Sequence, residues 1–299
     1  MRRVVVRYSP RSTYGQLYDA HVNPIRRHFD GSIKYDGTPN LKPSKEHFIF
    51  GLGIHSAATV FMSHGLADKS WRDADRLEHM HHVFVSGPAW KEKLKRQGRA
   101  ADTIHIVGYP YLDQALANEA RNEYVLWAPT HHASPSSHPE LDSPLHSAEE
   151  QGQLPFPLAV NLHPTLQTLG KGEPRSLAAG TLRGAAVVIA DSGSTIYEAW
   201  ALGIPVVFPD WIVAEKVKGE WPDSFEAQIY REQIGYHAHR SEQLLDSIRE
   251  AATNGITPKE EAFIEGILPT ALRGVSGMKA ARTLEWLYDR GGEPCPEQR

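Results

Sequence analysis

Short runs of hydrophobic residues alternate along the chain with longer stretches in which apolar residues recur at helical spacing. This alternation is typical of a parallel β-sheet covered by helices rather than of a β-sandwich, so we expect the α/β class. In the first half of the chain, the pattern predicts strands at residues 4–8, 47–50, 59–63, 83–86 and 104–107. In the second half, it predicts strands at residues 124–128, 158–162, 186–190, 205–208 and 236–238.

Three helices of the second half have recognisable ends. The first follows residue 191 and stops at Gly203, which can adopt a left-handed C-cap conformation, and Pro205 prevents its continuation. Another starts near Ser241 and runs to residue 254, and a last amphipathic helix covers residues 278–288. Residues 130–153 are rich in Ser, Pro, His and Glu with little apolar periodicity, so we expect a long loop there.

Length and composition exclude several classes of protein. The chain has 299 residues, of which 40% are hydrophobic and 23% charged, with a mean hydropathy of −0.43. These values exclude a collagen, a coiled coil and a wholly disordered chain. No apolar run approaches the roughly 18 residues that span a bilayer, so we expect a cytoplasmic protein without a transmembrane segment. Cys295 is the single cysteine, which excludes an intrachain disulfide and a cysteine metal cluster.

Charge is distributed unevenly along the chain. Residues 1–122 contain 18 Lys and Arg against 12 Asp and Glu, whereas the remainder contains 14 against 24. A basic half favours an anionic partner such as a phosphate polymer, a nucleic acid or a phospholipid surface. The acidic half argues against coating of the whole protein onto DNA, and a plain difference in charge between two domains explains the same counts.

The segment that follows the predicted strand 186–190 is the richest in candidate chemistry. A turn of small residues there leads into a helix, and free backbone N–H groups at a helix start form an anion site with the positive end of the helix dipole. The candidate donor-binding residues are Ser192, Gly193, Ser194, Thr195 and Glu198.

These five residues predict a site for a nucleoside diphosphate. Gly193 lets a phosphate approach the backbone, the three hydroxyls supply further donors, and the Glu198 carboxylate is placed to accept from both ribose hydroxyls. The alternative is a capping box formed by Thr195 and Glu198, which needs no ligand. A capping box does not explain the crowded Ser-Gly-Ser turn, and we therefore favour the diphosphate.

Two histidines follow predicted strands, where ligands bind in open α/β sheets. His163 ends the strand at 158–162 and is a candidate donor to a phosphate of the nucleotide. His64 ends the strand at 59–63 and is a candidate general base, because an unperturbed imidazole titrates near neutral pH. Lys69 and Arg72 lie just downstream and are candidates for binding an acceptor or a phosphate, with solvated surface charges as the alternative.

The 16 histidines raise a metal hypothesis, which the spacing does not favour. The clusters at residues 79–82 and 131–132 lack an accompanying His-Glu-x-x-His or similar carboxylate pattern, so we expect no metal and no resident cofactor. Lys91, Lys95 and Arg99 recur at helical spacing and predict a basic helix face, which either is simply solvated or helps to hold an acidic acceptor.

Five segments of the chain, taken in order, resemble the CDP-glycerol glycerophosphotransferase family, which includes teichoic-acid polymerases and primases. Together they span about residues 59–210, roughly half the chain. The matching segments are 63–65 with Lys69, 107–113 (Val-Gly-Tyr-Pro-Tyr-Leu-Asp), 125–130 (Val-Leu-Trp-Ala-Pro-Thr), 162–164 (Leu-His-Pro) and 190–195 (Ala-Asp-Ser-Gly-Ser-Thr). Residues 191–199 are also similar to the UDP-binding segment of the UDP-N-acetylglucosamine 2-epimerases.

The resemblance implies a GT-B-like fold, with two Rossmann-like domains whose parallel sheets face a central cleft. We expect an acceptor domain at 1–121, a nucleotide-donor domain at 122–275, and a C-terminal helix and polar tail at 276–299 that pack back on the first domain. By this likeness His64 matches a proposed general base, His163 matches a histidine that contacts donor phosphates, and the epimerase counterpart of Glu198 holds ribose. Gly193 and Ser194 match a pair of serines.

These expectations combine into one function. The chain is expected to move a sugar or polyol-phosphate group from a CDP- or UDP-linked donor to the hydroxyl of an anionic acceptor, such as a phosphate polymer. Three alternatives stay open. They are a glycosyltransferase acting on hydroxylated bases in DNA, a non-catalytic protein that binds nucleotide sugars, and a 2-epimerase, which is weaker because its likeness is confined to the nucleotide segment.

Overall fold

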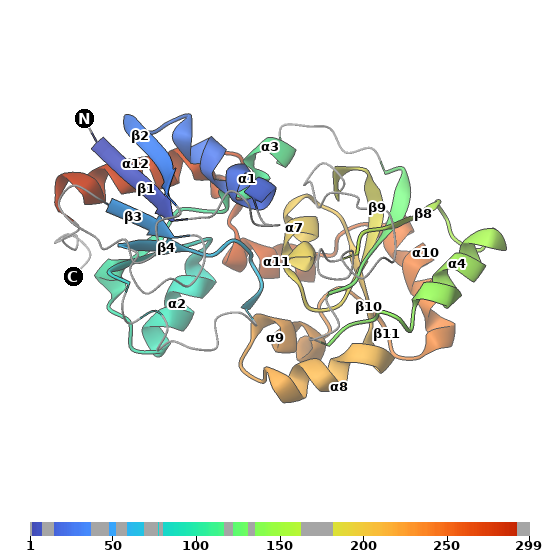
Figure 1. The fold of residues 1–299 in the computed structure, drawn as a ribbon. Coiled ribbons are helices and arrows are strands. Elements are labelled where there is room, and N and C mark those ends of the chain that lie inside the picture. Colours follow the sequence, from blue (N-terminus) through green and yellow to red (C-terminus); the bar gives the residue numbers. More distant parts are fainter. Residues whose placement is uncertain are drawn as a thin grey trace. The chain divides into compact units, whose positions relative to one another are not determined.

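The hydrophobic runs form two separate parallel sheets in the computed structural model of the chain (Figure 1). The structure describes residues 2–7, 15–36, 48–51, 59–68, 77, 80–116, 122–130, 135–162 and 182–291. The chain divides into two compact units. The first unit comprises Met1–Leu66, Trp71–Ala117 and Glu265–Arg299, and the second comprises Ala67–Ser70 and Asn118–Ile264. Each unit therefore contains segments that are distant in the sequence.

The sheet of the first unit has six parallel strands in the order β2-β1-β3-β4-β5-β6. The strands are β1 (Arg2–Arg7), β2 (Gly31–Asp36), β3 (Phe48–Gly51), β4 (Val60–Met62), β5 (His82–Val85) and β6 (Ile104–Ile106). The α-helices of this unit are α1 (Gly15–Arg26), α2 (Pro88–Arg96), α3 (Asp113–Leu116) and α12 (Ser276–Asp289).

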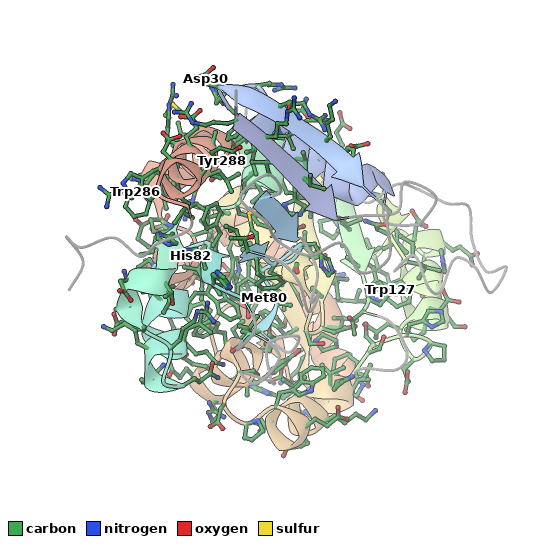
Figure 2. The ribbon with its side chains drawn as sticks, turned by 60° about the vertical axis from the view of Figure 1, so that its left-hand side comes forward. Asp30, Met80, His82, Trp127, Trp286 and Tyr288 are labelled. Carbon is green, nitrogen blue, oxygen red and sulfur yellow. The ribbon has the colours of Figure 1, made fainter. Side chains whose placement is uncertain are left out.

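The C-terminal helix α12 completes the core of the first unit. Ala280, Ala281, Leu284 and Leu287 of α12 are fully buried in one cluster with Val4 and Val6 of β1. Trp286 and Tyr288 lie on the same helix (Figure 2) and pack against this cluster. The helix begins where two of its backbone N–H groups, those of Ser276 and Gly277, donate to the Asp113 carboxylate at 3.2 and 2.7 Å.

The chain returns to the first unit at Glu265. We expected this return at residue 276. Ser86 donates its hydroxyl to the Ile267 carbonyl at 2.7 Å. Gly87 lies so close to the same carbonyl that an added Cβ would meet the oxygen at 2.4 Å. These contacts join residues 265–267 to the end of β5.

The sheet of the second unit has five parallel strands in the order β11-β10-β9-β7-β8. They are β7 (Tyr124–Ala128), β8 (Leu158–Val160), β9 (Ala185–Ala190), β10 (Val206–Pro209) and β11 (Tyr236–Ala238). The α-helices are α4 (Asp142–Glu150), α7 (Ser194–Ala201), α8 (Asp210–Glu220), α9 (Phe225–Glu232), α10 (Leu244–Asn254) and α11 (Pro258–Ile267), the last of which ends in the first unit.

The ten predicted strands are all present, with ends shifted by no more than two residues. The strand β2 was not predicted, because its sequence Gly-Ser-Ile-Lys-Tyr-Asp has only two apolar side chains and it lies at the edge of its sheet. The prediction of a continuous loop at 130–153 is wrong, because α4 occupies residues 142–150. Leu141, Leu145 and Ala148 are the apolar residues that this helix buries, too few to produce a clear helical periodicity.

Candidate functional site

The candidate donor site lies where β9 ends and α7 begins, in the second unit. Residues 187–190 of β9 are almost completely buried, and Asp191 and Ser192 continue this burial into the turn. Gly203, with a φ of +76°, ends the helix as the sequence predicts. The five-strand sheet thus holds the start of α7 at the carboxyl edge of its central strand.

Asp191 and Ser192 fix the shape of this turn from inside. The Asp191 carboxylate accepts the backbone N–H groups of Thr130 and Ser137, both from the segment after β7, at 2.9 and 3.0 Å. The Asp191 carbonyl accepts the hydroxyl of Tyr230 at 2.5 Å. Ser192 donates its hydroxyl to the Pro135 carbonyl at 3.2 Å, so this hydroxyl proton is directed into the protein.

Within the described residues, the start of α7 has no recorded side-chain cap. Gly193 is the N-cap, no side chain caps the helix, and no acidic residue occurs in its first turn. Thr195 is the second residue of the helix, so the capping box that would explain Thr195 and Glu198 without a ligand is not formed. Among the residues that the structure describes, no acceptor is recorded for the backbone N–H groups of Ser194 and Thr195. The positive end of the helix is therefore a candidate anion site.

Gly193 has ordinary backbone geometry, with φ at −103°. Among the described residues, an added Cβ would meet only the Thr130 hydroxyl oxygen, at 3.8 Å. The glycine is therefore required neither by its conformation nor by these described neighbours. Glu198 is four residues after Ser194, on the same face of α7, and is buried.

A short segment that follows His64 in the sequence belongs to the second unit and contacts this site. Ala67 donates its backbone N–H to the Ser194 hydroxyl oxygen at 3.2 Å. The Asp68 N–H donates to the Glu226 carboxylate at 2.9 Å, and the Asp68 carboxylate accepts the N–H of Phe225 at 2.8 Å. Sequence patterns gave no signal for these contacts, because they join residues more than 120 positions apart.

His64 lies in the first unit, two residues after the end of β4, and its backbone carbonyl accepts from two donors. Its carbonyl oxygen is 3.0 Å from Nε2 of His21 and accepts the hydroxyl of Tyr109 at 3.2 Å. The His21 ring is wholly buried against Tyr109 and Tyr111. Burial lowers the pKa of His21 to about 3, so this imidazole is neutral at pH 7 and donates through Nε2.

A pocket in the first unit lies beside this histidine. Its lining includes Ser63, Gly65, Leu66, Trp90, Gly108 and Tyr109. Tyr109 belongs to segment 107–113, which is part of the family resemblance. This segment was the sequence signal that could have drawn attention to Tyr109. His21 had no such signal.

Other candidates lie outside the described residues or serve the fold. His163, Lys69 and Arg72 belong to the first group. Arg99 belongs to the second, because its guanidinium donates to three backbone carbonyls, those of Leu77, Met80 and His81. The expected basic face therefore does not extend to Arg99.

The histidine cluster at 79–82 is described in part. His82 lies buried on β5 (Figure 2), and its Nδ1 is 3.1 Å from Nε2 of His105. Within the described parts of the chain, no three His, Cys, Asp or Glu side chains are grouped to hold a metal ion. In the same parts of the chain, no helix is both long and apolar enough to cross a membrane.

The fold is shared with enzymes that have a GT-B-like architecture of parallel sheets. The chain is similar to the wall teichoic acid polymerase TagF, with a TM-score of 0.61 and 11% identity over 96% of this chain and 89% of that one. A variant of that polymerase soaked with CDPG gives a TM-score of 0.58 at 10% identity, over 97% of this chain and 89% of that one. No family model matches the chain, and no curated protein matches its sequence.

The second group of similar structures consists of epimerases. The UDP complex of S. aureus MnaA has a TM-score of 0.60 at 9% identity, with 99% of each chain covered. The UDP-GlcNAc 2-epimerase of Methanocaldococcus jannaschii, in complex with UDP-GlcNAc and UDP, has a TM-score of 0.54 at 12% identity, over 95% of this chain and 99% of that one. At such identities the similarity establishes an α/β, GT-B-like fold, and its structural neighbours include both a transferase and an epimerase.

Proposed function

We propose that this protein is a transferase that moves a sugar or polyol-phosphate group from a CDP- or UDP-linked donor to an acceptor hydroxyl. The observation that carries the proposal is the uncapped start of α7 at the carboxyl edge of its sheet, with no acidic residue in the first helical turn. Backbone N–H groups in this position bind phosphate. The similar structures include complexes with UDP and with UDP-GlcNAc, and a polymerase variant soaked with CDPG.

In this proposal the donor diphosphate binds to the backbone from Gly193 to Thr195, with His163 as a further donor. Glu198 accepts the ribose hydroxyls. As the bond to the transferred group breaks, negative charge builds on the departing phosphate, and fixed N–H donors stabilise that charge without reorganising. Ser192 contributes through its position in the turn, since its hydroxyl proton is already bonded to Pro135.

His64 is the proposed general base of the reaction. It would take the proton of the acceptor hydroxyl while that oxygen attacks the donor. The two hydrogen bonds to its backbone carbonyl restrain the segment that bears the imidazole. Lys69 and Arg72 are proposed to bind an anionic acceptor such as a phosphate polymer.

A 2-epimerase is the second candidate, favoured by the nearly equal similarity to MnaA. The two functions differ in their products. An epimerase converts UDP-N-acetylglucosamine into its epimer without an acceptor, whereas a transferase moves the sugar to an acceptor and releases the nucleotide. Incubation with UDP-N-acetylglucosamine alone, followed by analysis of the sugar, distinguishes them.

The primary test is a thermal-shift panel with CDP, CDP-glycerol, UDP, UDP-N-acetylglucosamine, UDP-glucose, GDP and ADP. A ligand at about 100 times its Kd adds about 2.7 kcal/mol to the stability of the folded state, which raises Tm by a few degrees. We expect a selective shift with cytidine or uridine compounds, and a weaker response in the Glu198→Gln variant. If no nucleotide shifts Tm, the start of α7 is not a nucleotide site.

A further inference from the structure

A group of three polar side chains at the carboxyl edge of the second unit is not used by the proposed reaction. Asp210 directly follows β10, His237 lies in β11, and His239 directly follows β11. Both strands run parallel to β9, so these residues lie at the same edge of the sheet as the start of α7. Open α/β sheets bind their ligands at this edge.

The Asp210 carboxylate lies between two imidazoles. Its side chain is only 8% exposed, with one oxygen 2.8 Å from Nδ1 of His237 and the other 3.0 Å from Nδ1 of His239. His237 is itself buried and stacks on the Phe208 ring at 4.8 Å between centroids, with an angle of 22° between the planes. The aspartate is therefore held in one position by the core.

His239 is exposed and yet fixed. Its side chain is 57% exposed, its ring is nearly parallel to that of His237 at 6.4 Å, and its backbone N–H donates to the Gln243 side chain at 2.9 Å. By contrast, the 52%-exposed His146 has its nearest carboxylates at 3.7 and 3.9 Å, both on its own helix. Of these interactions, the contact with Asp210 is the one that restrains the ring, and holding an exposed side chain in one rotamer costs conformational entropy.

The 3.0 Å contact with Asp210 turns Nδ1 of His239 toward the carboxylate and leaves Nε2 as the nitrogen for a ligand. A carboxylate is an acceptor, so it favours the tautomer that carries its proton on Nδ1. Among the described residues, no partner is recorded for Nε2. When the ring is neutral, Nε2 accepts from a hydroxyl, and when it is protonated, Nε2 donates to a phosphate oxygen.

A single ligand molecule bound at the start of α7 is long enough to reach Nε2 of His239. Strand β11 is two places from β9 in the sheet, which corresponds to about 10 Å between the ends of these two strands. Tyr230 connects the two places, because its hydroxyl bonds to the Asp191 carbonyl at 2.5 Å while its ring packs edge-on against His237 at 5.8 Å.

We propose that His239 is a second contact for the ligand held at the start of α7, where its Nε2 binds a hydroxyl or phosphate oxygen of the nucleotide-activated donor. Asp210 is the positioning residue that sets the tautomer and orientation of the ring. This inference rests on the proposed function, because it takes the donor nucleotide as the ligand.

The test is calorimetric titration of the full chain and two variants, His239→Ala and His146→Ala, with CDP, UDP, CDP-glycerol and UDP-N-acetylglucosamine. His146 is the matched control, as an equally exposed histidine of the same unit. We expect His239→Ala to weaken binding of the preferred donor at least tenfold, and His146→Ala to leave it unchanged. A loss that extends to CDP or UDP assigns the contact to the nucleotide, whereas a loss confined to the activated compounds assigns it to the transferred group.

Equal affinities in His239→Ala and the unchanged chain would overturn the inference while leaving the proposed function intact. If the unchanged chain binds none of the four compounds, the proposed function itself fails, and the contact assigned to His239 fails with it. A nitrogen-15 NMR spectrum of the histidine rings tests the geometry without a ligand. We expect a proton on Nδ1 of His239, lost from that position in Asp210→Asn, and a bare Nδ1 in the unchanged chain would contradict the positioning role.

Discussion

At the scale of single residues, the proposed base His64 depends on groups that do not themselves react. Its carbonyl oxygen receives one hydrogen bond from a buried neutral imidazole and another from a phenol. Such contacts act through geometry, since a small displacement of a base from the proton it abstracts lowers the rate.

Replacing Tyr109 by Phe removes one donor to the His64 carbonyl while keeping the ring that packs on His21. We expect kcat of the transfer reaction to fall about fivefold, corresponding to about 1 kcal/mol for one hydrogen bond, with KM for the donor unchanged. Tyr35→Phe is the control, because this tyrosine also donates to a partner, Asp19, within the same unit. Equal losses in both variants would indicate a general effect on folding rather than on the base.

The buried histidines predict that acid destabilises the fold. Burial lowers the pKa of both His21 and His105 to about 3, below the ordinary value of 6.5. Between these pH values the unfolded chain binds protons that the folded chain excludes, so the free energy of unfolding falls as pH decreases. Each histidine contributes up to about 1.4 kcal/mol per pH unit within that window.

Urea unfolding at several values between pH 7 and pH 5 measures this slope. We expect His105→Gln to be less stable at pH 7. Its free energy of unfolding should also depend less steeply on pH, because the variant lacks one of the two histidines that take up a proton only when the chain unfolds. The exposed His146 is the control position, and its replacement by Gln should leave the slope as it was. An unchanged slope in His105→Gln would show that its ring is not shielded from water.

At the scale of elements, the sequence predicts strands and helices that have a clear local hydrophobic pattern. It misses features that depend on which elements become neighbours in the fold. Buried β-branched runs such as β9 were predicted because every residue in them is apolar. Edge strand β2 and helix α4 were missed because few of their side chains are buried. In the candidate site, the turn after β9 was predicted from its small residues. Asp210 and His239 were not, because their relation depends on which strands become neighbours.

Two glycines at helix starts are expected to differ in how well they tolerate an added side chain. Among the described residues, the nearest atom to a Cβ on Gly193 would lie at 3.8 Å, whereas a Cβ on Gly277 would lie 2.6 Å from the backbone of Pro24 in α1. We expect Gly193→Ala to change the free energy of unfolding by less than about 0.5 kcal/mol, and Gly277→Ala to cost about 1–3 kcal/mol through overpacking. Chemical denaturation of both variants measures the difference. A large loss in Gly193→Ala would mean that the turn tolerates no side chain.

At the scale of the whole molecule, neither unit is a continuous piece of chain. The first unit needs residues from both ends of the sequence, and the second unit includes Ala67–Ser70, which lie between two segments of the first. Asp68 in that short segment is bonded to Glu226 and Phe225 of the second unit. A cut at a single point therefore does not separate the units, and we expect the first unit to need the C-terminal helix in order to fold.

A chain that ends at Ile264 provides the test. It lacks α12 and with it the buried face formed by Ala280, Ala281, Leu284 and Leu287, which closes the core over β1. Exposure of four buried apolar side chains costs several kcal/mol, enough to unfold a unit of ordinary stability. A chain that ends at Gly291 keeps all of α12 and serves as the control. Hydrogen exchange should show β1 amides unprotected in the shorter chain but protected in the control, with β9 amides protected in both. Protected β1 amides in the shorter chain would mean that the six-strand sheet folds without the C-terminal helix.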